Sequence, residues 1–139
     1  MPEDEPWEYT ISLPNDPRAV PVCRRTVRLL LALYGLPQLS ELAELVVAEL
    51  VSNAVRHTKG PASLRLRWAG RVLRIGVWDT DPTPPTPPAP SAAADLDTCG
   101  RGLALVRECA DEWGWFPLGT VRAPGSAGKF VWCELTAAA

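Results

Sequence analysis

The sequence predicts a single-domain α+β (α/β) two-layer sandwich, in which a mixed, mainly antiparallel sheet carries three helices on one face. Its 139 residues, 47% of them apolar, are enough for one hydrophobic core but not for two. Period-two alternation marks strands near both ends of the chain and in its middle, and helical spacing of apolar residues marks the segments between them. Residues 1–139 are therefore treated as one domain.

The chain opens with a strand and a helix. Apolar and polar side chains alternate in residues 7–13, which is typical of a half-buried strand. We expect a helix over residues 17–34, because Asn15 or Asp16 can cap its start and Gly35 can end it.

A second helix is expected over residues 39–57, with Ser40 at its start. On a helical wheel, Glu49, Asn53 and His57 lie in the middle of its apolar stripe. The apolar members of that stripe are Leu42, Leu45, Val46 and Leu50. A carboxylate and an amide on the core side of a helix cost free energy unless a partner satisfies them. That partner is either an arginine within the protein, which is the structural alternative, or a bound ligand or metal.

Further strands complete the predicted sheet. Residues 64–68 and 72–79 predict an antiparallel hairpin, because both alternate and a tight turn separates them. Residues 113–116 and 129–136, with a short piece at about 120–121, are expected to add strands after it.

The stretch 80–99 is rich in proline and suits neither a helix nor a strand. A loop of this length inside a compact domain is usually a lid or a linker. Gly100, Arg101 and Gly102 follow it and open a third helix, which we expect to run to about residue 110.

Two more signals point to a ligand. Asp79 ends an apolar strand, where a carboxylate beside apolar walls suits a flat ligand with an N–H donor. The start of the third helix offers free backbone N–H groups to a phosphate, and Arg101 adds a positive charge. The structural alternatives are an ordinary turn aspartate and a plain loop-to-helix junction.

Composition argues against several classes of function. The formal net charge of -2 is unlike that of a domain that binds nucleic acid directly. Four cysteines without a C-x-x-C pair, and a single histidine, argue against a zinc site. No apolar run approaches the roughly 20 residues of a membrane span, and the acidic N-terminus does not resemble a signal peptide. We therefore expect a cytoplasmic protein that does not bind membranes.

The order of these signals resembles the GHKL (Bergerat-fold) ATPase and kinase superfamily, which includes the histidine kinase-like ATPases. Within it, the chain looks most like the anti-sigma-factor serine/threonine kinase branch and its short actinobacterial relatives. Residues 49–57 match the N-box of the family, residues 77–81 its adenine-binding box, and residues 100–103 its second glycine box. The resemblance extends over residues 7–135.

The resemblance implies that the protein binds ATP and Mg²⁺. Asn53 would hold the Mg²⁺ ion, Glu49 would be the catalytic general base, and Asp79 would accept a hydrogen bond from the adenine amino group. Gly100, Arg101 and Gly102 would wrap the phosphates under an ATP lid formed by residues 80–99, between the sheet and the last helix, while His57 and Lys129 would line the pocket.

The resemblance also implies a regulatory role. The protein would phosphorylate a serine of an anti-sigma-antagonist protein of the STAS type, sequester a sigma factor, or do both. Because relatives of this type dimerise, Trp7 in the first strand would pair across a homodimer or pack locally.

One feature departs from the pattern of the family. The adenine-binding box usually reads Asp-x-Gly-x-Gly, but here Asp81 and Thr83 replace the two glycines and Pro82 stands between them. The turn is therefore stiffer, and its backbone is less free to approach a ligand. Two alternatives to a kinase follow: a non-catalytic module that binds its partner only with nucleotide, and an interaction domain without nucleotide binding.

Overall fold

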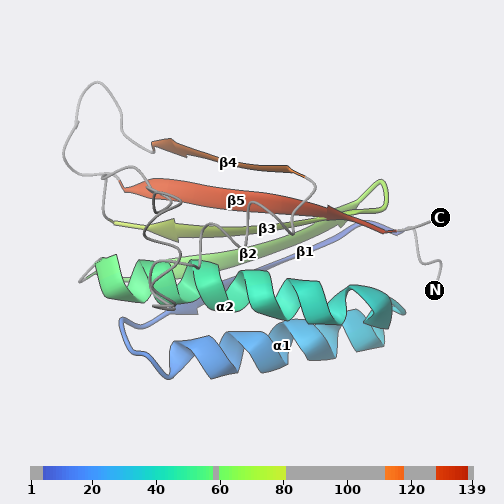
Figure 1. Ribbon diagram of the computed structural model, residues 1–139, viewed down its shortest axis with the longest axis horizontal. Helices are drawn as coiled ribbons and strands as arrows, with labels where there is room; N and C mark the ends of the chain where they lie inside the picture. The colour runs from blue at the N-terminus through green and yellow to red at the C-terminus, as the bar shows by residue number, and fades with distance from the viewer. Residues whose placement is uncertain (1–4, 58–59, 81–111, 118–127, 138–139) are drawn as a thin grey trace, which may run out of the picture.

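The computed structural model describes residues 5–57, 60–80, 112–117 and 128–137. Within them, two helices pack on one face of a five-stranded sheet (Figure 1). Neighbouring strands are antiparallel throughout, in the order β1-β2-β3-β5-β4. The elements are β1 (Trp7–Leu13), α1 (Ala19–Leu33), a 3-10 turn (Pro37–Leu39), α2 (Ser40–His57), β2 (Ala62–Ala69), β3 (Val72–Asp79), β4 (Glu112–Pro117) and β5 (Lys129–Thr136).

The two-layer α+β sandwich is confirmed, with a sheet that is antiparallel rather than mixed across its described strands. The predicted bounds of the first strand, residues 7–13, and of the last, residues 129–136, agree with β1 and β5. The expected third helix, most of the proline-rich stretch 80–99 and the short piece at 120–121 lie outside the described residues.

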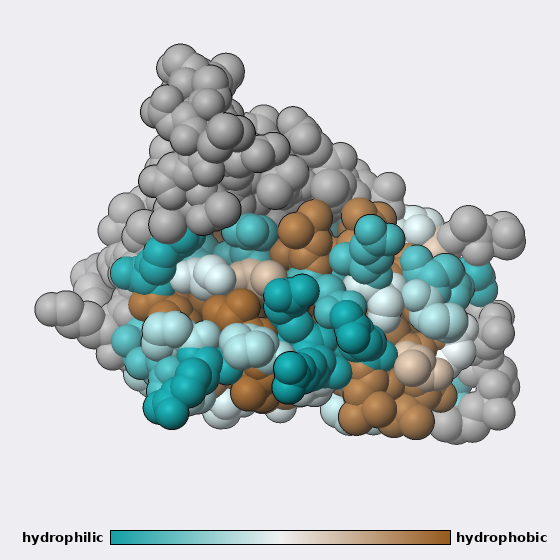
Figure 2. Space-filling model, turned by 60° about the horizontal axis from the view of Figure 1, so that its bottom comes forward, coloured by the Kyte–Doolittle hydropathy of each residue, from teal (hydrophilic) through white to brown (hydrophobic). Residues whose placement is uncertain are grey.

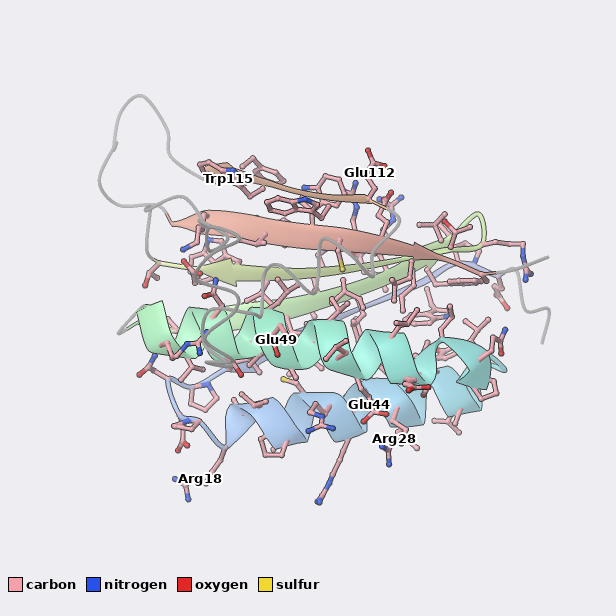
Figure 3. All side chains as sticks on the ribbon, viewed as in Figure 1. Arg18, Arg28, Glu44, Glu49, Glu112 and Trp115 are labelled. Atoms are coloured by element: carbon pink, nitrogen blue, oxygen red, sulfur yellow. The ribbon has the colours of Figure 1, made fainter. Side chains whose placement is uncertain are left out.

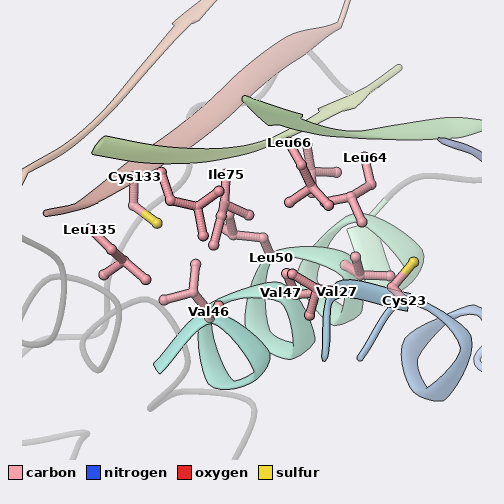
Figure 4. Packing of buried hydrophobic residues seen from close by; sticks show 14 of the residues in the cluster. Cys23, Val27, Val46, Val47, Leu50, Leu64, Leu66, Ile75, Cys133 and Leu135 are labelled. Atoms are coloured by element: carbon pink, nitrogen blue, oxygen red, sulfur yellow. The ribbon is translucent and has the colours of Figure 1, made fainter. Parts of the chain in front are cut away.

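The hydrophobic core lies between the sheet and the helices. Alternate residues of β2, β3 and β5 point into it, because successive side chains of a strand face opposite sides of the sheet. Figure 4 shows Ile75 and Leu66 of the sheet facing Leu50 and Val47 of α2. The largest fully buried side chains are Trp68, Leu31, Leu36, Leu64, Leu66, Leu73, Ile75, Leu135, Val27, Val46, Val47 and Val51.

Glycine ends α1 as expected. Gly35 has a φ of 76°, which an L-residue with a side chain rarely adopts. The N–H of Leu36 donates to the carbonyl of Leu31 at 2.7 Å, and the N–H of Gly35 donates to that of Ala32 at 3.3 Å. This is a Schellman motif, which satisfies the last carbonyl groups of the helix.

The β2–β3 hairpin turns through two residues with positive φ. Gly70 has a φ of 57° and Arg71 a φ of 63°. A two-residue hairpin turn of type I′ needs positive φ at both positions, because its twist matches that of the flanking strands. The turn thereby sets the register that places Ala69 opposite Val72.

An aromatic cluster ties β1 to the end of α1. The ring of Trp7 stacks on that of Tyr34 at 4.7 Å, and the hydroxyl oxygens of Tyr9 and Tyr34 lie 2.6 Å apart. Trp7 therefore packs locally, which was one of the two roles expected for it.

The buried face of α2 is rotated from the face that the helical wheel predicts. Ala43, Val47 and Ala54 are at most 1% exposed, whereas Leu42 is 40% exposed. Because α2 packs against both α1 and the sheet, its small residues allow the two layers to approach closely. Glu49 and Asn53 consequently lie on the flank of the buried stripe, not in its middle.

The two helices are joined by an ion pair. Arg28 of α1 donates from Nε and Nη2 to the two carboxylate oxygens of Glu44 in α2, at 2.8 and 2.9 Å. Glu44 is only 8% exposed. An arginine was one of the two partners considered for Glu49. The structure pairs an arginine with Glu44 instead, and Glu49 is not part of that pair.

The outer surface of the helical layer carries apolar side chains. Val22 and Leu29 of α1 are each 58% exposed, and Leu33 is 71% exposed. Their spacing places them along one line of the helix. Figure 2 shows hydrophobic patches interrupting the polar surface on this side of the molecule.

Candidate functional site

The candidate site begins with two polar side chains on α2. Glu49 and Asn53 lie one turn apart, so their side chains project from the same side of the helix. Both are half-buried. Figure 3 shows Glu49 midway along α2, separate from the Arg28–Glu44 pair. Among the residues that the structure describes, neither the carboxylate of Glu49 nor the amide of Asn53 has a hydrogen-bond partner.

Partial burial changes the acidity of Glu49. Desolvation raises the pKa of its carboxyl above the ordinary value of 4.5, and the positive charge of Arg56 opposes this rise. A carboxyl with a raised pKa is a better proton acceptor once it is ionised. The environment of Glu49 therefore suits a general base.

A buried ion pair marks the end of β3. The Nζ atom of Lys129 lies 3.1 Å from Oδ1 of Asp79, and both side chains are 3% exposed. The two residues are register partners, at the last position of β3 and the first of β5. A Cβ atom on Gly128 would lie 1.5 Å from the carbonyl oxygen of Asp79, so the chain must carry glycine just before Lys129.

Asn53 and the Asp79–Lys129 pair lie toward one end of the sandwich, and Glu49 lies one helical turn away from that end along α2. The C-terminal end of α2, the end of β3 that carries Asp79 and the start of β5 share the left side of Figure 1. The structure thus brings together the ends of the elements that carry Asn53, His57, Asp79 and Lys129. His57 is the last residue of α2, and its side chain is not described.

The remaining predicted site residues cannot be placed. Gly100, Arg101 and Gly102 lie outside the described residues, as do residues 81–99 of the predicted lid. Within the described part of the chain, no group of three or more histidine, cysteine, aspartate or glutamate residues could hold a metal ion.

Comparison with known protein families decides which fold family this arrangement represents. The family model of the histidine kinase-like ATPase domain matches residues 13–122, which is most of the chain. The chain belongs to the histidine kinase-like ATPase domain family. No curated protein matches the sequence. In this histidine kinase-like ATPase domain, no described helix is long and apolar enough to cross a membrane.

Membership implies that this ATPase domain binds ATP, and it agrees with the GHKL resemblance. The matched range includes α2 with Glu49 and Asn53, and β3 with Asp79, but it ends before Lys129. Sequence reasoning placed Lys129 in the pocket without finding its partner. The available signal was a lysine that opens one apolar strand and an aspartate that ends another, but pairing them requires the order of the strands.

Proposed function

We propose that this protein is an ATP·Mg²⁺-binding regulator that transfers phosphate to a serine of a partner protein. The proposal rests chiefly on Glu49 and Asn53, two half-buried polar groups without a hydrogen-bond partner among the described residues of an ATPase domain. Their polar atoms remain accessible, so a ligand can contact them directly.

Asn53 would provide the protein ligand for Mg²⁺. Its amide oxygen suits a hard cation, and Mg²⁺ usually takes only one or two protein ligands together with substrate phosphates and water. The absence of an acidic cluster among the described residues is compatible with this mode of binding. When bound, the ion would neutralise charge on the phosphates.

Glu49 would accept the proton of the serine hydroxyl. Its raised pKa and the absence of a hydrogen-bonded arginine support this role. Asp79 would accept a hydrogen bond from the adenine amino group. Lys129 offsets the negative charge of the Asp79 carboxylate at the end of β3. Backbone N–H groups at Gly100–Gly102 would bind the phosphates.

The partner would be an anti-sigma antagonist of the STAS type or a sigma factor. The exposed apolar side chains of Val22, Leu29 and Leu33 along one line of α1 support a protein partner, because apolar side chains grouped on a surface often mark an interface. We also propose that the protein forms a homodimer.

A second candidate function is a non-catalytic module that binds its partner only with nucleotide. The replacement of the two glycines by Asp81 and Thr83 favours it, because the adenine-binding box then departs from the usual pattern of the family.

Titration with Mg·ATP tests nucleotide binding. We expect Asn53→Ala to weaken binding by roughly tenfold to a hundredfold, the usual effect of losing a bond to a charged group. At 100 times Kd, ATP should stabilise the wild type by about 2.7 kcal/mol in thermal unfolding. The matched control is Glu41→Ala, an exposed position in the first turn of the same helix. If the wild type shows neither heat nor a thermal shift, both candidate functions are wrong.

Phosphate transfer separates the two candidates. With a STAS-type partner, the kinase proposal expects transfer that Glu49→Ala abolishes while ATP binding and Glu41→Ala activity persist. ATP-dependent partner binding without transfer, unchanged in Glu49→Ala, would support the binding module instead.

A further inference from the structure

The face of the sheet opposite the helices carries an open groove. On this face, the outward side chains of the five strands form three rows that run across the sheet. The rows form because each strand pairs with its neighbours in register. One row is charged, with two arginines between glutamates, and another is aromatic and includes Trp78, Phe130 and Phe116. The charged row consists of Glu8, Arg67, Arg74, Glu134 and Glu112. The groove has a volume of about 430 Å³ and is lined by Thr10, Ser63, Arg65, Arg67, Arg74, Trp78, Phe116 and Phe130.

The lining of the groove contains three arginines, and two of them are paired with glutamates at its edge, Arg65 with Glu8 and Arg74 with Glu134. Arg67 is exposed and has no ion-pair or hydrogen-bond partner among the described residues. Arg65 pairs with Glu8 beside the groove, but both side chains are exposed, so this pair costs little to rearrange.

The opposite wall of the groove is aromatic and pre-formed. The ring of Phe130 leans over Gly76, where an added Cβ atom would lie 2.1 Å from its Cζ atom. Phe116 packs beside Phe130 at 5.3 Å between ring centroids, and it remains 43% exposed. Arg74 lies 4.4 Å above the ring of Trp132 and donates to Glu134 at 3.0 Å, which holds it in place at the edge of the groove.

We propose that this groove docks a short acidic segment of a partner protein that carries an aromatic side chain between carboxylates. The carboxylates would meet Arg67 and its neighbouring arginines, and the aromatic side chain would pack on Phe116 and Phe130. Arginine and aromatic residues are the types that dominate binding energy at protein interfaces, and charge complementarity selects an acidic partner. The site is separate from the candidate ATP site, which lies on the helical side of the sheet.

A small ligand suits the groove less well. A small aromatic anion would lie on an open sheet face, whereas small ligands are usually enclosed over most of their surface.

Peptide binding to the full chain tests the proposal. The probe is a short fluorescein-labelled peptide of alternating glutamate and tryptophan, and anisotropy reports binding. We expect Arg67→Ala to weaken binding about tenfold, the size of one lost charge-assisted bond. Phe116→Ala should weaken it as well, because it removes the exposed end of the aromatic wall. Raising the salt concentration should weaken binding of the wild type.

Three controls make the result specific. Arg25→Ala removes the same charge from an exposed position on the helical layer and should leave the affinity unchanged. Asn53→Ala should also leave it unchanged, so that failure of this proposal is distinguished from failure of ATP binding. A peptide of alternating glutamate and serine should bind much more weakly.

Several results would overturn the proposal. Equal losses in Arg67→Ala and Arg25→Ala would show general electrostatic attraction and no groove. Equal binding of the serine peptide would exclude a role for the aromatic wall. A dimer that Arg67→Glu dissociates would assign the face to a second copy. Saturable binding of anilinonaphthalene sulfonate that depends on Arg67, without peptide binding, would assign it to small anions.

Discussion

At the scale of single residues, burial separates two glutamates of one helix. Glu44 is nearly buried and paired with Arg28, and it joins α1 to α2. Glu49 is half-buried without such a pair, so desolvation dominates its pKa. Glu44 is therefore a structural carboxylate, and Glu49 is the one available for chemistry.

The raised pKa of Glu49 predicts a dependence of stability on pH. The folded protein holds this proton more tightly than the unfolded chain does, so the stabilising contribution is full below the unfolded value of 4.5. The contribution is lost as pH rises through the folded pKa. Glu49→Gln replaces the ionisable carboxyl by a neutral amide, so the variant does not lose this stability as pH rises. We expect the variant to gain stability over the wild type at neutral pH, and the gain to shrink below pH 4.5.

Urea unfolding of both proteins at several pH values measures this difference, and Glu41→Gln is the exposed control on the same helix. A difference between Glu49→Gln and wild type that does not change with pH would contradict the prediction.

At the scale of elements, the register of β3 and β5 creates a contact that neither strand contains alone. Asp79 and Lys129 are opposite each other only because these two strands are neighbours in the sheet. Removing one partner of a buried ion pair leaves an uncompensated charge, which costs more than replacing both partners. The pair therefore fixes the start of β5 against the end of β3.

A double-mutant cycle tests this contact. Lys129→Met should destabilise the protein by about 3–5 kcal/mol, because it removes one member of a buried ion pair. Asp79→Asn combined with Lys129→Met should recover a large part of that loss. Chemical unfolding of the two single variants and the double variant gives the coupling. Simple additivity of the two substitutions would show that the pair contributes nothing specific.

At the scale of the whole molecule, the two layers share one core. Cys23 of α1 and Cys133 of β5 enter it from opposite sides, and both are free and fully buried (Figure 4). Burial raises the pKa of Cys23 to about 11 and that of Cys133 to about 12. Both thiols are therefore protonated at neutral pH and shielded from reagents.

These thiols report global unfolding. In a Cys99→Ser, Cys109→Ser variant, we expect iodoacetamide to label the native protein only as fast as it opens. Saturating Mg·ATP should slow the labelling further if the protein binds it. Denatured protein in urea is the control for complete labelling. Native labelling at the rate of an unprotected thiol would show that the core does not close around both cysteines.

Sequence patterns predicted the elements well and the details of packing less well. The bounds of β1 and β5 follow from period-two alternation, which depends only on neighbours along the chain. The buried face of α2 was predicted incorrectly, because a helical wheel weighs Leu42 above Ala43. Close packing against α1 and the sheet selects the smaller residue. The Glu49–Asn53 pair can be named from the sequence, since polar residues one turn apart need no tertiary information, and its role in the site stays a prediction.

The sequence by itself determined the order of the described strands and helices and the family, and it named the residues proposed for ATP chemistry, because these depend on local spacing. Only the tertiary structure decided that Glu44 and not Glu49 pairs with arginine, that Lys129 pairs with Asp79, and that arginines and aromatic rings share one groove on the sheet. The physical reason is that each of these contacts joins side chains from different elements. Their meeting depends on strand order, register and the rotation of α2, which no single segment of the chain encodes.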